Sequence, residues 1–251
     1  MLWKFPHIGK NVFKKLSNKN LAKCKKVSKT WECFLTNEKF YIQRVHYETK
    51  QKKTDTHGNT PLHAAARNGE LQKCKMIISQ VDNKNPRNDN GDTPLHFAAQ
   101  NGHSAICQLI INITPQKNPK ASDGLTPLHS AAVRGYLSIC QLILCDLKNK
   151  NPVMNFGMTP LHCAAIKGHF EVFKLIFENV EDRNPNSMFY RTPLHFAARN
   201  GYFDICKLIV DNITNVYPID NYGSTPLMEA KNHGHQQIVE YIKSAVVKMN
   251  D

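Results

Sequence analysis

Apolar residues recur at intervals of three and four along most of the chain, which is the spacing of one face of an α-helix. Segment 105–111, Ala-Ile-Cys-Gln-Leu-Ile-Ile, shows this pattern and predicts a short helix. Polar segments that favour tight turns, such as Asp-Asn-Gly-Asp at 89–92, separate the apolar segments. The pattern therefore predicts an all-α chain of short helices joined by tight turns.

The tetrad Thr-Pro-Leu-His recurs with a period of 33 residues. It begins at Thr60, Thr93, Thr126, Thr159 and Thr192, and Thr-Pro-Leu-Met begins at Thr225. Two further series, of Gly and of Pro, keep the same period: Gly69, Gly102, Gly135, Gly168, Gly201 and Gly234, then Pro86, Pro119, Pro152, Pro185 and Pro218. Three series at one spacing predict a solenoid of repeated units from about residue 58 onward.

Each unit contains the start and stop signals of two helices. The Thr hydroxyl can cap free N–H groups, and Pro suits the first helical position. Leu-His-x-Ala-Ala predicts a short helix whose small residues allow close packing on the next unit. The Gly that follows suits a left-handed residue that ends the helix. A second apolar helix and an Asn-Pro end complete the unit.

These motifs resemble the ankyrin repeat over roughly residues 54–247. The resemblance implies an ankyrin-repeat solenoid of stacked helix–turn–helix units, with hairpin loops projecting to one side. We assign a basic linker at 51–57 and repeats at 58–90, 91–123, 124–156, 157–189, 190–222 and 223–251. The last unit is predicted to be a C-terminal cap with a polar outer face, because Met228 replaces His and Glu229 and Lys231 enter its first helix.

Residues 1–50 lack the repeat, and their apolar spacing predicts a small module of two or three short helices. The pattern from Phe13 to the Val27-Ser28-Lys29-Thr30-Trp31 segment resembles the F-box over about residues 5–46. That family is a three-helix motif that binds the Skp adaptor of cullin–RING ubiquitin ligases. The resemblance implies adaptor contacts for seven residues: Pro6, Ile8, Val12, Phe13, Leu16, Leu21 and Val27.

The alternative is that Phe13, Val27 and Trp31 form only the core of this module. Two acidic positions of the family pattern are absent, since His7 follows Pro6 and Asn20 precedes the Leu.

The positive charge of the chain is concentrated in its N-terminal part. Residues 1–53 hold 14 Lys and Arg against 3 Asp and Glu, whereas residues 54–251 hold 19 against 17. Such a segment suits an acidic protein partner or nucleic acid. Nucleic acid is the weaker candidate, because Arg44 is the only Arg of the segment.

The histidines and cysteines of the repeats do not predict a metal site. His63, His96, His129, His162 and His195 occupy one slot of successive units and are too far apart to converge on zinc. The ankyrin resemblance implies that each bonds to loop backbone. Cys74, Cys107, Cys140 and Cys206 share a slot with Phe173, which favours packing of free thiols. We expect no enzyme, no cofactor and no metal.

The repeat slots also predict where a target protein binds. Apolar residues occupy hairpin tips and exposed inner-helix positions of the later repeats. They are Leu125, Val133, Phe156, Met158, Ile166, Phe189, Tyr190 and Tyr222. Tyr190 stands where the other five units have Gly. Phe97 and Phe196 occupy a slot that the family buries and are left out. Alternatively, the apolar tips lie flat against neighbouring loops and shield backbone.

The sequence favours a substrate-recognition subunit of a Skp–cullin–F-box ubiquitin ligase, monomeric by itself. One alternative is an ankyrin scaffold whose N-terminal helices only cap the solenoid. Another is a nucleic-acid-associated regulator that uses the basic module. The longest apolar runs fall short of the roughly 18 residues of a membrane span, and the first residues lack a secretory signal, so we expect an intracellular protein.

Overall fold

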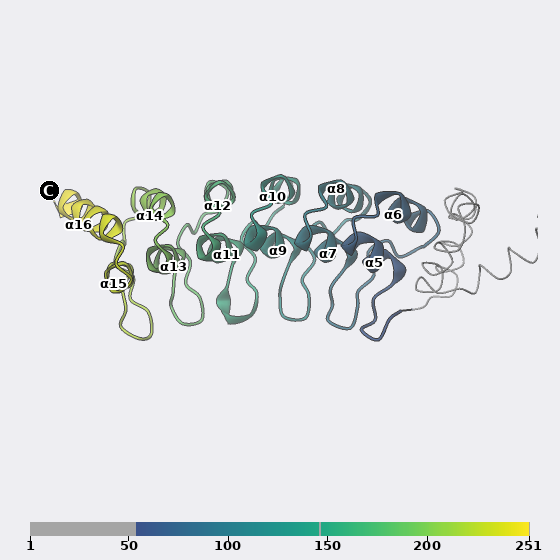
Figure 1. The fold of residues 1–251 in the computed structure, drawn as a ribbon, viewed down its shortest axis with the longest axis horizontal. Helices are drawn as coiled ribbons and strands as arrows, with labels where there is room; N and C mark the ends of the chain where they lie inside the picture. The colour runs from purple at the N-terminus through teal and green to yellow at the C-terminus, as the bar shows by residue number, and fades with distance from the viewer. Residues whose placement is uncertain (1–53, 146, 251) are drawn as a thin grey trace, which may run out of the picture.

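The computed structural model describes residues 54–145 and 147–250, with side chains up to residue 245. In this part of the chain there are twelve α-helices and one short 3₁₀ helix, and no strand. The helices form two rows, with the hairpin loops projecting from the inner row (Figure 1). The predicted all-α ankyrin-type solenoid is therefore confirmed for the repeats.

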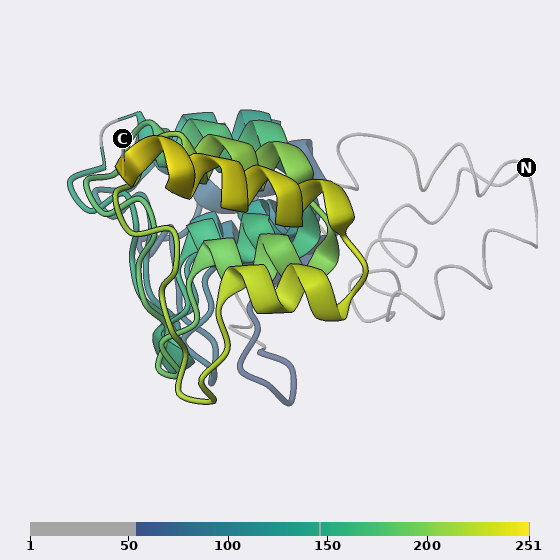
Figure 2. The ribbon, with the colours of Figure 1, turned by 90° about the vertical axis from the view of Figure 1, so that its left-hand side faces the viewer.

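Each unit contributes one inner helix, which begins at the Pro of the tetrad, and one outer helix. The inner helices are α5 (Pro61–Arg67), α7 (Pro94–Gln100), α9 (Pro127–Arg134), α11 (Pro160–Lys167), α13 (Pro193–Asn200) and α15 (Pro226–Asn232). The outer helices are α6 (Leu71–Ile78), α8 (Ser104–Ile113), α10 (Leu137–Leu144), α12 (Phe170–Phe177), α14 (Phe203–Val210) and α16 (Gln236–Asn250). The 3₁₀ helix η1 (Asn155–Gly157) lies at a hairpin tip. Seen from the α15–α16 end, the outer helices, the inner helices and the hairpins form three successive layers (Figure 2).

The inner helices begin and end at the residues that the tetrad and the Gly series predict. In α9, Thr126 has an extended backbone and forms a capping box with His129. The amide N–H of Thr126 donates to Nδ1 of His129 over 3.2 Å. Gly135 ends the helix with φ 75°, in the left-handed region. The local signals alone therefore fix the ends of this helix.

The core is a continuous row of small and aliphatic side chains between the two helix layers. Leu95, Leu128 and Leu161 are fully buried, as are the Ala pairs that follow them. Cys107 and Cys140 lie in the same buried row as Phe173, so the predicted packing role of this slot is confirmed. Burial raises the pKa of the Cys140 thiol to about 12, which keeps the thiol protonated and unreactive.

The structure corrects the expectation of a polar outer face at Glu229. This side chain is buried and has 6% of its surface exposed. Its Oε1 lies 3.4 Å from Nη2 of Arg191, and the hydroxyl of Ser224 donates to it over 3.1 Å. Glu229 therefore ties the last inner helix to the preceding repeat, because a buried carboxylate needs a partner.

The expected burial of Phe97 and Phe196 is also incomplete, since both are half-buried. The ring of Phe97 meets the His63 ring edge-on at a centroid distance of 5.7 Å, and the Arg67 guanidinium lies 4.2 Å from its centroid. Both rings therefore contribute to the surface of the array.

The seven predicted adaptor contacts lie outside the described residues. They are Pro6, Ile8, Val12, Phe13, Leu16, Leu21 and Val27. Among the described helices, none is both long and apolar enough to span a membrane.

Candidate target-binding surface

A histidine in each inner helix connects one repeat to the next. Nδ1 of His162 accepts the amide N–H of Thr159 over 3.1 Å, so the ring proton sits on Nε2. Nε2 donates over 3.1 Å to the carbonyl of Arg191, one repeat further on. The same pair of contacts occurs at the other tetrad histidines, which are His63, His96, His129 and His195. The predicted bond to loop backbone is confirmed.

Burial keeps these five histidines neutral. It lowers the pKa of all five rings, to about 4 for His129 and His162, although the carbonyl that accepts from Nε2 acts in the opposite direction. Both ring nitrogens are hydrogen-bonded to backbone groups, so neither can coordinate a metal ion. Within the described residues, no group of three or more His, Cys, Asp or Glu side chains is placed to hold a metal ion.

Backbone hydrogen bonds hold neighbouring hairpins side by side. The amide of Asn155 donates to the carbonyl of Asp123 over 2.8 Å, and the amide of Met188 donates to the carbonyl of Phe156 over 2.8 Å. Asn221 donates to Phe189 over 3.1 Å in the same way. These bonds place equivalent residues of successive hairpins next to one another, so side chains at the tips form one continuous edge.

The exposed apolar residues of the described chain gather on this edge. Eight large apolar side chains are exposed, and all lie between residues 153 and 228. Seven of them, named here the hairpin patch, come from the loops before α11, α13 and α15: Val153, Phe156, Met188, Phe189, Tyr190, Ile219 and Tyr222. The eighth, Met228, lies on α15. Apolar groups gathered in this way are typical of a protein-binding surface.

Four of the eight residues predicted as target contacts belong to the hairpin patch. Their exposed fractions are 61% for Phe156, 41% for Phe189, 56% for Tyr190 and 72% for Tyr222. The rings of Phe189 and Tyr222 lie 6.4 Å apart between centroids, with 31° between their planes. Their exposure fits a binding role, and their role as target contacts stays a prediction.

The other four predicted contacts, Leu125, Val133, Met158 and Ile166, are half-buried. They lie at the base of the hairpins and on the inner helices, away from the tips.

The sequence analysis did not identify Val153, Met188 and Ile219. Val153 and Ile219 share one slot, six residues before the Thr of the tetrad, where earlier repeats have Arg87 and Lys120. Met188 stands four residues before its Thr. Comparing these two slots across the repeats would have identified all three residues, because each replaces a polar residue of the early units.

Two aromatic residues of the hairpin patch have a left-handed backbone. Phe156 has φ 61° and Tyr190 has φ 58°, and they are the only described non-glycine residues with positive φ. Tyr190 occupies the slot at which Gly58, Gly91 and Gly223 have φ between 74° and 78°. A bulky residue in this region carries strain of about 1–2 kcal/mol, which proteins retain mainly at functional positions.

A buried charge network supports the C-terminal part of the hairpin patch. Nε of Arg191 donates to Oδ2 of Asp220 over 2.8 Å, and its guanidinium lies 5.5 Å from the centroid of the Tyr222 ring. Burial by itself would raise the pKa of Asp220. The hydrogen bonds from the amides of Ser224 and Tyr222 and from the Arg191 guanidinium have a larger effect, and they hold the pKa of Asp220 below its usual range. The network holds the Tyr222 hairpin against its neighbour.

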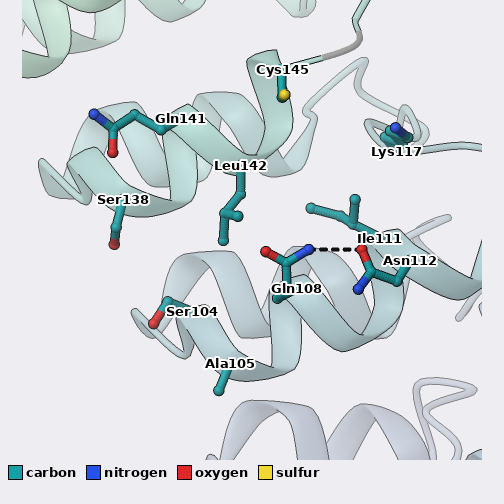
Figure 3. A pocket seen from close by; sticks show the side chains of 10 residues that line it. All are labelled: Ser104, Ala105, Gln108, Ile111, Asn112, Lys117, Ser138, Gln141, Leu142 and Cys145. Atoms are coloured by element: carbon teal, nitrogen blue, oxygen red, sulfur yellow. Dashed lines mark hydrogen bonds between the residues drawn. The ribbon is translucent and has the colours of Figure 1, made fainter.

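Two hollows of about 600 Å³ each lie elsewhere on the array. The first, named here the inner groove, lies on the inner-helix side and is lined by Gln100, Leu125, Ser130, Val133, Arg134, Lys167 and His169. The second lies between the outer helices α8 and α10 (Figure 3). Leu142 projects into it, and an amide pair, Gln108 donating to Asn112 over 2.7 Å, forms part of its wall. The outer hollow presents no acid–base pair that could catalyse a reaction.

The comparisons with known proteins agree with this architecture. A family model of ankyrin repeats in three copies matches residues 33–121, 111–188 and 179–251, and a model of the F-box domain matches residues 6–43. A crystal structure of an ankyrin repeat domain from Acinetobacter baumannii is 28% identical. The match covers 74% of this chain and 97% of that chain, with a TM-score of 0.67. No curated protein matches the sequence. Both matched families are protein-interaction modules, and the chain belongs to the ankyrin-repeat family.

Proposed function

We propose that this chain is the substrate-recognition subunit of a Skp–cullin–F-box ubiquitin ligase. The N-terminal module would bind the Skp adaptor, and the ankyrin repeats would bind the target protein. The chain itself forms and breaks no bond. It raises the local concentration of target lysines at the ligase, because two binding modules are joined in one chain.

The observation that carries the proposal is the hairpin patch on an array that follows an F-box match. Seven exposed apolar side chains lie on three adjacent hairpins and form one surface. Aromatic and Met side chains dominate it, and these residue types supply most of the binding energy at protein interfaces. The strained backbones of Phe156 and Tyr190 support a binding role, since shielding of the loop would not require them.

The adaptor half is tested by pull-down of a purified Skp adaptor with the full-length chain. We expect capture by the wild type and loss of capture in Phe13→Glu, because a charge replaces an apolar contact that the F-box resemblance implies. Lys15→Glu is the matched control, since it introduces the same residue two positions away. No capture by a folded wild-type chain would favour the alternative, an ankyrin scaffold without an adaptor. The absence of acidic residues near Pro6 and at Asn20 supports that alternative.

The target half is tested with Phe156→Ala combined with Tyr190→Ala. Both side chains are more than half exposed, so the array should stay folded while target capture falls. Gln108→Ala combined with Gln141→Ala on the outer helices is the matched control. Unchanged capture in the aromatic double variant would place the target elsewhere on the array.

A further inference from the structure

The inner groove carries positive charge that the described chain does not neutralise. Arg134 and Lys167 end the helices α9 and α11, and both side chains are exposed. No carboxylate is among the residues that line the groove. In the described part of the chain, no acidic side chain forms an ion pair with either residue.

Two other cations of the inner row, each one position earlier in its repeat than Arg134 and Lys167, are engaged within the chain. The Arg67 guanidinium lies over the Phe97 ring at 4.2 Å from its centroid. Nη1 of Arg199 lies 4.0 Å from Oε2 of the buried Glu229. The helix dipole favours a cation in the last turn of a helix, which accounts for the position of Arg134 and Lys167 but leaves each side chain free to pair with a ligand.

The remaining lining residues of the inner groove are the aliphatic Leu125 and Val133, the uncharged polar Gln100 and Ser130, and His169. Leu125 and Val133 are half-buried and form its apolar side. Nε2 of His169 donates over 3.0 Å to the carbonyl of Val133, so this nitrogen is not available to a ligand. The carboxylate of Asp123, two residues before Leu125, accepts the Leu125 amide over 2.8 Å. The groove therefore offers an apolar wall beside two unneutralised cations.

We infer that the inner groove binds an acidic segment of the target protein, in which Asp or Glu side chains stand next to an aliphatic residue. The carboxylates would pair with Arg134 and Lys167, and the aliphatic side chain would lie against Leu125 and Val133. Charge complementarity is the argument for this occupant, because a groove with two cations and no carboxylate attracts acidic partners and repels basic ones. The hairpin before α11 adjoins that of Leu125 through the Asn155–Asp123 bond, so one target segment can reach both the groove and the hairpin patch.

This inference rests on the proposed function of the repeats as a target-binding array, and a peptide selection tests it. Short random peptides are displayed and selected on the full-length chain, and the affinities of the most frequent peptides are measured by fluorescence polarisation. We expect peptides that combine Asp or Glu with Leu, Ile, Val or Phe. Arg134→Glu combined with Lys167→Glu should weaken them about tenfold or more, because attraction becomes repulsion at two positions.

The matched control is Lys75→Glu combined with Lys174→Glu, which makes the same charge change on exposed positions of the outer helices α6 and α12. This control should leave the affinity unchanged. Guanidinium unfolding at pH 7 checks that both double variants are folded, and binding by a folded wild type is compared only with folded variants.

The other outcomes separate the inference from the proposed function. Neutral apolar peptides that bind equally well to the Arg134/Lys167 variant but lose affinity in Phe156→Ala with Tyr190→Ala would overturn the inference and leave target binding in place. A short single-stranded RNA that binds the wild type and not the Arg134/Lys167 variant would assign the groove to nucleic acid and overturn it. Failure to select any peptide on the folded wild type would overturn both.

Discussion

Acid should unfold this array at a pH at which its carboxylates are still ionised. His129 and His162 are neutral in the folded chain, with a pKa of about 4, against an ordinary value of 6.5 that the unfolded chain regains. Between these values the unfolded chain binds one more proton per histidine than the folded chain. The stability that these two histidines contribute is therefore fully present above pH 6.5, and the free energy of unfolding falls as the pH drops toward 4.

The magnitude follows from the two pKa values. Each histidine contributes a loss of about 1.4 kcal/mol for every pH unit below 6.5. His129 and His162 together should remove about 4 kcal/mol between pH 7.5 and pH 5. His63, His96 and His195, whose pKa is lowered in the same direction, add to this loss. Since a domain is commonly stable by about 5–15 kcal/mol, the loss is a large part of the total.

Guanidinium unfolding followed by circular dichroism at pH 7.5, 6.5, 5.5 and 5 measures the loss. The variant His129→Gln with His162→Gln is the informative comparison, because Gln at the third helical position can still accept the Thr amide but does not titrate. This variant should be less stable than the wild type at pH 7.5, since Gln does not reproduce the bond to the next repeat. Its loss between pH 7.5 and pH 5 should be smaller by about 4 kcal/mol. Equal losses in the two proteins would refute the assignment of neutral, proton-resistant histidines.

Two further predictions concern buried groups of the array. Glu229→Ala should lower the free energy of unfolding by about 3 kcal/mol, because Arg191 loses a buried partner. Hydrogen exchange should become faster mainly in α15. Exchange that becomes faster in α9 than in α15 would contradict this prediction. Among the described cysteines, Cys145 is exposed and Cys140 is buried, so an alkylating reagent should modify Cys145 in the native protein and Cys140 only after denaturation. Peptide mass mapping measures the modification of both residues. Rapid modification of Cys140 in the native protein would contradict its burial.

The 33-residue period was sufficient to predict the solenoid, because each helix start and stop is encoded by the local sequence. The Thr-Pro pair and the Gly of each unit determine their own backbone, so Thr126 and Gly135 have the predicted conformations. The burial of Glu229 could not be predicted from the sequence, because its partner Arg191 lies 38 residues earlier and contacts it only after the repeats stack. The sequence predicts an exposed Glu229 because the residue is polar and lies in the terminal repeat, whereas stacking of the repeats brings Arg191 next to it and buries it.

The candidate site was predicted in part for a similar reason. The exposure of Phe156, Tyr190 and Tyr222 follows from their place at the hairpin tips, which the period fixes. The half-burial of Met158 and Ile166 depends on side chains of the adjacent repeats and needs the packed structure. The inner groove is likewise absent from any one repeat, since its lining comes from three inner helices and two loops.

The last repeat differs from the others in what covers it. In the earlier repeats, a ring of the next unit lies against the helix-ending glycine, as Tyr202 does at Gly168, whereas nothing described lies against the corresponding Gly234. A solenoid unit with a neighbour on one side only has half the usual stacking energy and opens most readily. Ile219 and Tyr222 lie in the hairpin that leads into this unit, so a partner seated there would act as a missing neighbour. Target binding would then be measurable without any label on the target, as slower hydrogen exchange at the end of the array.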